Sequence, residues 1–322
     1  MFTLDFSFFS DSLLIFLLAF LIDLAFGELP DNLHPTLWIG KIISFLKKKL
    51  KNPNNSKEKF NGILLCFFSI IIYVIPVILI ITLVRNFLGW LPFIIVSAFI
   101  LSTTIAIRCM SQYTIPVAKA LENYDSDKAK KLLPFIVRRN PDELTRRNII
   151  SAAVETIAEG TTDGITSPFF YFALFGVPGA VTYRVVNTLD SMVGYKDSEN
   201  INIGWFSAKM DTLLNYVPAR LTALLMIIAS IIARENWKEA SRILNRDKNN
   251  TESPNAGWTL STMAGALNIQ LEKPGFYVVG DNNILTPKHI IKALKIMLVA
   301  TVLFAILIIF PILLIKAIVF SV

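Results

Sequence analysis

The chain has 322 residues, of which 54% are hydrophobic and only 17% are charged, and its mean hydropathy is +0.57. The apolar residues occur in long runs, so the composition excludes a water-soluble globular protein and predicts an integral membrane protein. The net charge of +7 is explained by Lys and Arg in cytoplasmic loops and gives no reason to expect nucleic acid as a partner.

The first half of the chain contains three predicted transmembrane helices. Residues 12–26 follow an N-terminus without Lys or Arg, unlike a cleaved signal peptide, and precede the Lys-rich segment 41–60. Because positively charged loops stay in the cytoplasm, segment 41–60 is predicted to be cytoplasmic. Residues 62–84 and 91–109 are long enough to cross a bilayer and are joined by a short turn, so they are predicted to form a transmembrane hairpin.

A polar, basic segment, residues 110–165, follows and is predicted to be cytoplasmic. It ends in a predicted helix that begins near Pro141, a residue favoured in the first helical turn. Gly160 is predicted to end this helix, because glycine is the commonest residue just beyond a helix C-terminus.

This central helix carries a polar face. Ser151, Glu155 and Glu159 follow one another at helical spacing, with Asn148 on the same side, and the predicted turn after the helix carries Asp163. Two acids one turn apart repel by about 0.2–0.5 kcal/mol, which a divalent cation or a shared proton would offset. A solvated acidic surface is the alternative, and spacing alone does not decide between them.

Two later hydrophobic segments, 166–186 and 213–233, contain prolines and one arginine each, so both are marginal as spans. They are either helices that are re-entrant or buried within the protein, or full crossings, and the two alternatives give the same orientation to everything downstream. Residues 234–290 are polar and predicted to be cytoplasmic, and residues 291–320 form the last predicted span. The sequence thus predicts a single all-α, polytopic membrane domain with about four clear transmembrane helices, two marginal hydrophobic helices and cytoplasmic helical loops.

Further polar residues lie next to these marginal segments. Before a predicted helix break at Gly194, helical spacing is shared by Arg184, Asn187, Asp190 and Ser191. The polar residues that follow are Lys196, Asp211, Asn215, Arg220 and Asn255. Such groups are costly beside apolar segments unless they pair or bind a ligand. A structural network and a site that holds Mg²⁺ and phosphate are both consistent with them. The sequence contains no P-loop, Gly-rich kinase loop or dinucleotide fingerprint.

Several separated motifs, in order, resemble the adenosylcobinamide-phosphate synthase family (CobD/CbiB) of cobalamin biosynthesis, and together they cover roughly residues 23–280. They are the His34-Pro35 block, ETIAEGTTDG (155–164), Ser167-Pro168, Tyr183-Arg184, NTLDSMVGYK (187–196), Asp211 with Asn215, PARLTA (218–223) and SPNAGW (253–258).

The resemblance implies a membrane ligase that forms a carbon–nitrogen bond. It would join a propionate carboxylate of adenosylcobyric acid to (R)-1-aminopropan-2-ol or its O-phosphate, giving adenosylcobinamide or its phosphate. The implied cofactors are ATP, which would convert the carboxylate to an acyl phosphate, and Mg²⁺. The implied location is the cell membrane, with the active site facing the cytoplasm. Self-association of the chain is left open.

The residues that match the family's motifs receive the following expected roles. Glu155, Glu159, Asp163 and Asp190 would position Mg²⁺ and phosphate, the first three as metal ligands. Arg184, Lys196 and Arg220 would neutralise phosphate. The residues expected to contact substrate are His34, Asn187, Ser191, Asp211, Asn215, Arg220 and Asn255. The competing interpretation is a membrane protein that binds or transports a corrinoid without catalysis, since transporters also combine broken helices with intramembrane charge.

Overall fold

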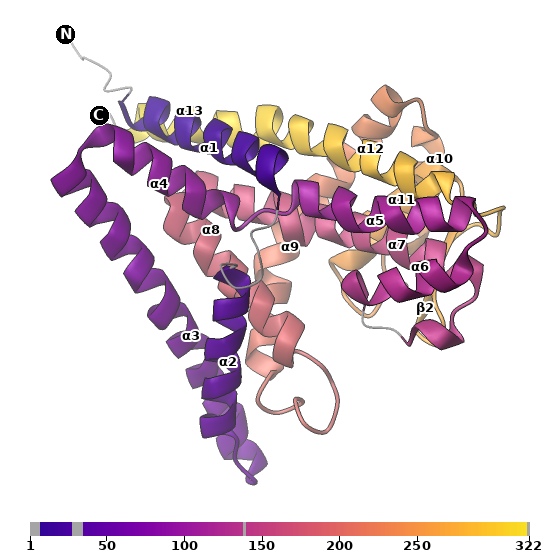
Figure 1. Cartoon of the computed structure of the whole chain (residues 1–322), viewed down its shortest axis with the longest axis horizontal. Helices are drawn as coiled ribbons and strands as arrows, with labels where there is room; N and C mark the ends of the chain where they lie inside the picture. The colour runs from indigo at the N-terminus through magenta and orange to yellow at the C-terminus, as the bar shows by residue number, and fades with distance from the viewer. Residues whose placement is uncertain (1–6, 28–34, 138–139, 321–322) are drawn as a thin grey trace. The chain divides into compact units, whose positions relative to one another are not determined.

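Long helices dominate the computed structural model, which describes residues 7–27, 35–137 and 140–320 (Figure 1). The helices are α1 (Ser7–Phe26), α2 (Pro35–Leu50), α3 (Asn55–Leu83), α4 (Trp90–Ser102), α5 (Ile107–Glu122), α6 (Ser126–Leu132), α7 (Arg146–Thr161), α8 (Ser167–Val193), α9 (Trp205–Ala233), α10 (Trp237–Asp247), α11 (Ala256–Leu267), α12 (Lys288–Phe304) and α13 (Phe310–Phe320). Wide π-helical turns join several of them: η2 (Val84–Leu88), η5 (Thr162–Thr166) and η6 (Ala305–Ile309). Short 3₁₀ turns are η3 (Leu133–Phe135) and η4 (Pro141–Glu143).

Among the described residues, six helical stretches are long and apolar enough to cross a membrane. They are Phe9–Phe26, Asn55–Leu88, Trp90–Glu122, Arg146–Val193, Trp205–Ala233 and Lys288–Val319. Each stretch contains an apolar window of 18 residues. The windows in the two stretches that contain the segments predicted to be marginal are the most buried, 56% in Arg146–Val193 and 50% in Trp205–Ala233, against 22–44% in the others. The prediction of an all-α polytopic membrane protein is confirmed.

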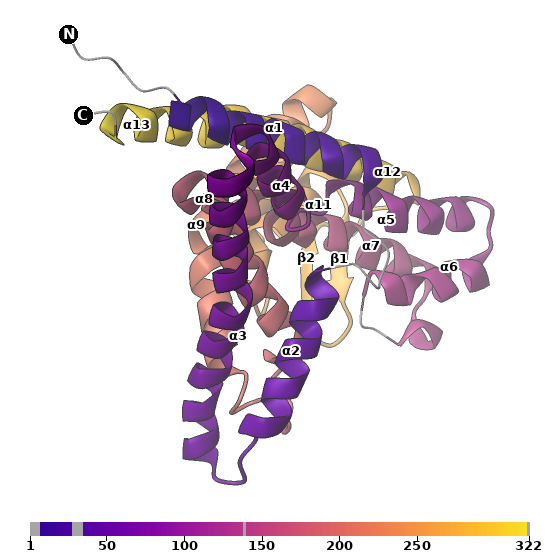
Figure 2. The ribbon, with the colours of Figure 1, turned by 60° about the vertical axis from the view of Figure 1, so that its left-hand side comes forward.

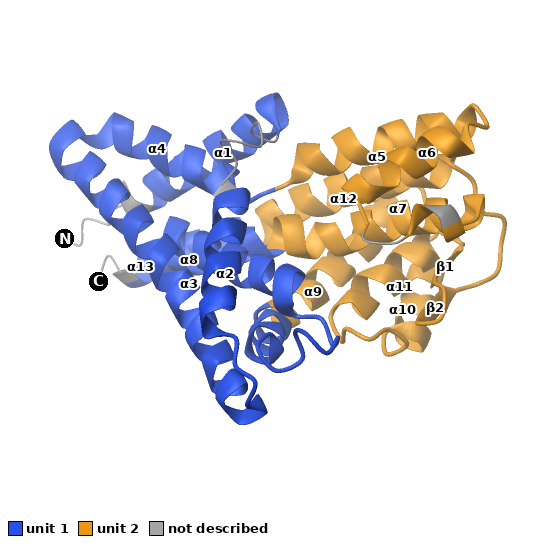
Figure 3. Ribbon diagram, turned by 60° about the horizontal axis from the view of Figure 1, so that its bottom comes forward, with its two compact units in different colours: residues 1–105, 167–214, 308–322 blue, residues 106–166, 215–307 orange. Residues whose placement is uncertain are grey.

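The described chain divides into two compact units (Figure 3). Unit 1 comprises residues 1–105, 167–214 and 308–322, and unit 2 comprises residues 106–166 and 215–307. Neither is continuous in sequence, so the chain passes between them repeatedly, inside helix α9 and at the start of α8. No change of composition marks these passages.

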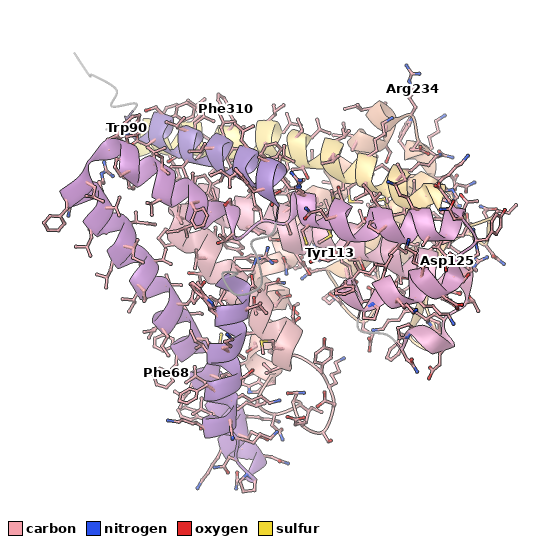
Figure 4. The ribbon with its side chains drawn as sticks, in the orientation of Figure 1. Phe68, Trp90, Tyr113, Asp125, Arg234 and Phe310 are labelled. Atoms are coloured by element: carbon pink, nitrogen blue, oxygen red, sulfur yellow. The ribbon has the colours of Figure 1, made fainter. Side chains whose placement is uncertain are left out.

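In unit 1, α2 and α3 lie side by side and pack against the second half of α8 (Figures 1 and 2). Their shared core contains Ile43, Leu65, Val186 and Leu189, all fully buried. Helix α1 runs beside α4 and α13, where the rings of Phe9 and Phe310 meet edge to face with centroids 5.5 Å apart. Side chains on the outer faces, such as Phe68, Trp90 and Phe310, are large, apolar and exposed (Figure 4), as expected for helices that contact lipid.

Helix α8 is broken at Gly176. This glycine has φ +69° and ψ −162°, values that separate the half-helix 167–175 from the half-helix 177–193. Pro178 follows and has no backbone N–H, so the carbonyl of Leu174 loses its usual helical donor. Lys316 of α13 donates instead to the carbonyls of Ala173 and Leu174, at 3.1 and 2.8 Å. This break lies inside segment 166–186, which was predicted to be a marginal span because of its prolines.

Helix α7 occupies the centre of unit 2 and contacts α5, α11, α12 and strand β1 (Gln270–Lys273). It begins at Thr145, whose hydroxyl accepts a hydrogen bond from the N–H of Asn148, so the prediction that Pro141 opens it was wrong. The prediction that Gly160 ends it was also wrong, because the helix continues through η5 into α8. Gly160 instead provides space, since a Cβ there would lie 2.6 Å from Cε of Met110 on α5.

A β-hairpin in unit 2 was not predicted. Strands β1 and β2 (Tyr277–Gly280) pair antiparallel, with Leu271 opposite Val279. They are only four residues long and sit in a stretch with no strong alternation of apolar and polar residues. In the part of the chain that the structure describes, this hairpin is the only sheet.

An ionic cluster joins α10 to the end of β2. Arg246 donates to Asp247 and Asp281, at 2.6 and 2.7 Å, and Arg242 also pairs with Asp281. Burial alone would raise the pKa of Asp247, but hydrogen bonds from Arg246 and from the N–H of Gly280 outweigh it and hold that pKa below its ordinary value. The hydrogen bond from Arg246 likewise lowers the pKa of Asp281.

The cluster predicts an acid-sensitive component of stability. A carboxylate whose folded pKa is lowered stabilises the fold at pH values above its unfolded pKa, and this contribution disappears as the pH falls through the folded pKa. The thermal midpoint of the detergent-solubilised protein should therefore fall as the pH drops below the ordinary value of 3.8. Asp281→Asn should flatten this acid limb. An unchanged limb in that variant would show that the cluster does not contribute.

Candidate functional site

The acidic face of α7 is tied to the hairpin by a buried polar network in unit 2. The carboxylate of Glu155, which is 2% exposed, accepts hydrogen bonds from the Ser151 hydroxyl and the Tyr277 hydroxyl, both at 2.6 Å. Asn148 donates to Glu272 of β1 at 2.7 Å, and the Glu272 N–H donates to Ser151 at 2.8 Å. Three of the residues predicted on one polar face thus face the same hairpin. Glu155 is a structural partner of that hairpin.

Removing the Tyr277 hydroxyl should therefore destabilise the protein. Tyr277→Phe removes one of the hydrogen bonds that the buried Glu155 carboxylate accepts, at a cost of about 1–3 kcal/mol. Thermal unfolding in detergent measures this as a lower midpoint. Tyr124→Phe is the control, because Tyr124 is 85% exposed. Equal midpoints for the two variants would contradict a structural role for this hydrogen bond.

Glu159 and Asp163 lie further along the same helical path, on α7 and in η5, and both are half-buried. Between them lies Thr162, whose hydroxyl is buried and has no hydrogen-bond partner among the described residues. π-Helical turns of this kind occur frequently at functional sites. The hydroxyls of Thr166, at the end of η5, and Thr222 of α9 are 2.6 Å apart, which brings the TTDGIT segment against the PARLTA segment.

The three acids Glu155, Glu159 and Asp163 were expected to bind one metal ion. Within residues 7–27, 35–137 and 140–320, no three His, Cys, Asp or Glu side chains are grouped so as to hold a metal. Glu155 faces the hairpin, whereas Glu159 and Asp163 lie beside or within η5. Magnesium is commonly held by one or two carboxylates together with substrate phosphates.

In unit 1, the polar end of α8 forms a second group of predicted residues. Arg184 donates through Nε to the carbonyl of Thr104, at 3.0 Å, and through a second nitrogen to the same carbonyl. Its remaining Nη1 reaches Asn187 at 3.4 Å, and Asn187 donates to Asp211 of α9 at 3.2 Å. Arg184, Asn187 and Asp211 therefore form one network, and Thr104 is a partner that the sequence did not indicate.

The acid Asp190 lies one turn further on and is half-buried. A Cβ at Gly194 would fall 2.0 Å from Oδ1 of Asp190, so only glycine leaves room for this carboxylate. Ser191 is exposed and donates to the carbonyl of Asn187 at 2.9 Å. Lys196 lies in the exposed loop after α8 and makes no hydrogen bond or ion pair with the described residues. Lys47 fixes this loop through Glu199, at 2.6 Å.

A third group lies in unit 2 and joins the PARLTA and SPNAGW motifs. The guanidinium of Arg220 stacks over the ring of Tyr216, 3.5 Å from its centroid, and lies 4.8 Å from the ring of Trp258. Its Nη1 donates to the carbonyl of Tyr216 and to Oδ1 of the buried Asn255, at 2.6 and 3.1 Å. Lys248 approaches Trp258 at 5.1 Å. The predicted pair Arg220 and Asn255 is thus in direct contact.

Of the remaining predicted residues, Asn215 lies on α9 and is 2% exposed, and His34 falls outside the described residues. The sequence analysis missed Tyr216, Lys248, Trp258 and Tyr277. Trp258 stands in a motif that was recognised, and an aromatic residue four positions before Arg220 was a readable signal for Tyr216. Nothing in the sequence indicated that Tyr277 would contact Glu155, because the hairpin itself was not predicted.

Long apolar helices that carry buried carboxylates and amides define a polytopic α-helical membrane protein with polar groups inside both of its units. The chain matches the family model described as "CobD/Cbib protein" over residues 16–317. The chain belongs to this family.

The names of curated relatives agree with this family membership. The chain is 43% identical over 267 residues to the "Probable cobalamin biosynthesis protein CobD" of Methanothermobacter thermautotrophicus, covering 83% of this chain and 86% of the relative. It is 38% identical over 270 residues to the "Cobalamin biosynthesis protein CobD" of Dehalococcoides mccartyi, covering 84% and 87%. A third relative, from Methanocaldococcus jannaschii, is 37% identical and is described in the same words as the first. No solved structure matches the chain.

Proposed function

We propose that this protein acts in cobalamin biosynthesis as a membrane ligase that forms an amide. The observation that carries the proposal is the family match over residues 16–317, together with relatives named as cobalamin biosynthesis proteins. The acid substrate is a propionate carboxylate of adenosylcobyric acid. The amine is (R)-1-aminopropan-2-ol or its O-phosphate, and the product is adenosylcobinamide or adenosylcobinamide phosphate.

Amide formation from a free carboxylate is uphill in water, so the carboxylate needs activation. A carboxylate oxygen attacks the terminal phosphorus of ATP, the bond from that phosphorus to the bridging oxygen breaks, and ADP leaves. The amine nitrogen then attacks the acyl phosphate, the carbon–oxygen bond to phosphate breaks, and nitrogen releases a proton. Both steps build negative charge on phosphate oxygens, which fixed cations stabilise.

The residues beside η5 fit a magnesium ion. Glu159 and Asp163 would supply oxygen ligands of the hard type that Mg²⁺ prefers, and Thr162 offers a buried hydroxyl whose hydrogen bonding is unmet among the described residues. When bound, the ion neutralises phosphate charge. Glu155 has a supporting role, because its two oxygens hold Ser151 and Tyr277.

The candidate cations and amides differ in how many of their hydrogen-bonding groups are already used by other residues. Arg184 is occupied by Thr104 and Asn187, so it holds the polar end of α8 in place. Lys196 is exposed, which suits neutralisation of phosphate or of the developing acyl phosphate. The amide groups of Asn187, Asn215 and Asn255 and the polar groups of Ser191 and Asp211 are suited to the amide-rich rim of a corrinoid.

The site is expected to face the cytoplasm, where ATP is present. Ser198 lies in the exposed loop after α8 and reports this orientation. In a background that lacks Cys66 and Cys109, Ser198→Cys should react with an impermeant maleimide only after cells are opened. Reaction in intact cells would place this loop on the outside and contradict the proposed orientation.

The test of function is a product assay with detergent-purified protein. Adenosylcobyric acid, Mg-ATP and either amine are incubated together, and products are identified by mass spectrometry beside a reaction without ATP. The proposal expects a new amide that forms only with ATP. Corrinoid binding without an amide, under conditions in which the protein is monodisperse, would contradict it.

The second candidate is corrinoid binding or transport, and the break in α8 at Gly176 favours it, because transporters use discontinuous helices at their binding sites. Proteoliposomes distinguish the two. A transporter moves labelled corrinoid across the vesicle membrane and leaves it chemically unchanged, whereas the ligase changes its mass.

A further inference from the structure

We propose that Tyr216, Arg220, Lys248 and Trp258, here termed the arginine clamp, form a binding site for a dianionic phosphate group. The geometry of Arg220 carries this inference. Its Nη1 is used by the Tyr216 carbonyl and by Asn255, at 2.6 and 3.1 Å, whereas its Nε and Nη2 have no acceptor among the described residues. These two nitrogens form the edge of a guanidinium that binds phosphate in a bidentate manner.

The aromatic rings hold that edge in position. The guanidinium lies 3.5 Å from the centroid of Tyr216 and 4.8 Å from that of Trp258, and Asn255 fixes its rotation. An arginine fixed in this way loses little conformational freedom when a ligand binds. The clamp is also reachable, because Arg220, Lys248 and Trp258 are only half-buried.

The charge of the clamp matches a phosphate monoester. Lys248 lies 5.1 Å from the same indole ring and has no hydrogen-bond or ion-pair partner among the described residues. Asp247, beside it in sequence, is neutralised by Arg246. The two available positive charges suit a phosphate monoester, which carries about −1.5 to −2 near neutral pH, better than a single carboxylate.

The SPNAGW motif is built to maintain the clamp. Asn255 accepts from Arg220, Trp258 stacks on it, and Gly257 lets the chain at Lys248 come close. A Cβ at Gly257 would fall 2.1 Å from the carbonyl oxygen of Lys248, so a larger residue would push Lys248 away. The contacts of Asn255, Gly257 and Trp258 explain why an amide, a glycine and an aromatic residue occur together in this motif.

The source of the phosphate depends on the proposed function: it is either the phosphate of the phosphorylated amine or the terminal phosphate of ATP. Binding to the full-length protein in detergent is measured by isothermal titration with aminopropanol phosphate, aminopropanol and ATP, each separately. The clamp predicts that Arg220→Gln weakens binding of at least one phosphate-bearing probe by about 10- to 100-fold. Aminopropanol binding stays unchanged. The probe that is affected identifies the source.

Arg234→Gln is the matched control, because Arg234 directly follows the same helix and its exposed side chain points away from the fold (Figure 4). Trp258→Phe keeps a ring and should retain most of the binding, whereas Trp258→Leu and Lys248→Gln should weaken it, so the test does not depend on one variant. Equal affinities in Arg220→Gln and Arg234→Gln, or no binding of any phosphate-bearing probe by the unaltered protein, would overturn the proposal. Product formation could still occur in that case, so the proposed reaction is judged separately.

Discussion

Replacing Asp163 with alanine is expected to slow amide formation by roughly 10²–10³-fold, because it removes a carboxylate that we propose to position magnesium and phosphate. Asp163 is half-buried in the π-turn η5, next to Thr162, whose buried hydroxyl has no hydrogen-bond partner in the described part of the chain. Glu159→Ala should have an effect of the same size, since the two acids lie on one helical path. The rate of product formation at saturating substrate is the quantity to measure.

Asp127→Ala is the control for this loss, because Asp127 is an exposed acid in the first turn of α6. Membrane insertion and the thermal midpoint of Asp163→Ala should match those of the unaltered protein, which separates a chemical effect from misfolding. If Asp163→Ala retains its rate, Asp163 has no place in the mechanism, and Glu159 alone would have to hold the ion.

Replacing Lys316 with methionine is expected to produce the largest loss of stability. Lys316 supplies donors to the carbonyls of Ala173 and Leu174, which the break at Gly176 and the missing N–H of Pro178 leave unsatisfied. Each carbonyl left without a donor costs about 1–3 kcal/mol, and no water replaces the donor in the hydrocarbon layer. The thermal midpoint in detergent should fall clearly.

Lys316→Arg is the companion variant, because it retains N–H donors at the same place. It should recover most of the lost stability. The second half of α8 carries Arg184, Asn187 and Asp190, so Lys316→Met should also lower the rate of product formation. A midpoint for Lys316→Met equal to that of the unaltered protein would mean that the two carbonyls do not need this lysine.

Much of the fold follows from hydrophobic length, which the sequence displays directly. Segments such as 62–84 and 91–109 are long, apolar and nearly uncharged, so their assignment needs no tertiary information. The end of α7 could not be predicted in this way. Glycine is a residue type that commonly ends helices, but Gly160 instead leaves space for the side chain of Met110. This contact joins helices that are far apart in sequence.

The sequence was sufficient to predict which residues belong to the candidate site, but not which residues they contact. Helical spacing placed Arg184, Asn187 and Asp190 on one helix, and the structure confirms that placement. The partners come from elsewhere in the chain: Thr104 for Arg184, Trp258 for Arg220 and Tyr277 for Glu155. Contacts of this kind, such as the hydrogen bond from Tyr277 of the hairpin to Glu155, decide the role of each acid on α7.

The central claim is that ATP activates the corrinoid carboxylate, and transfer of oxygen tests it most directly. Adenosylcobyric acid labelled with ¹⁸O in the reacting carboxylate is incubated with the purified protein, Mg-ATP and the amine, and the released phosphate is analysed by mass spectrometry. Attack of the carboxylate on the terminal phosphorus predicts one ¹⁸O atom in each inorganic phosphate formed with the amide. Amide formation with unlabelled phosphate, or without ATP, would contradict the account.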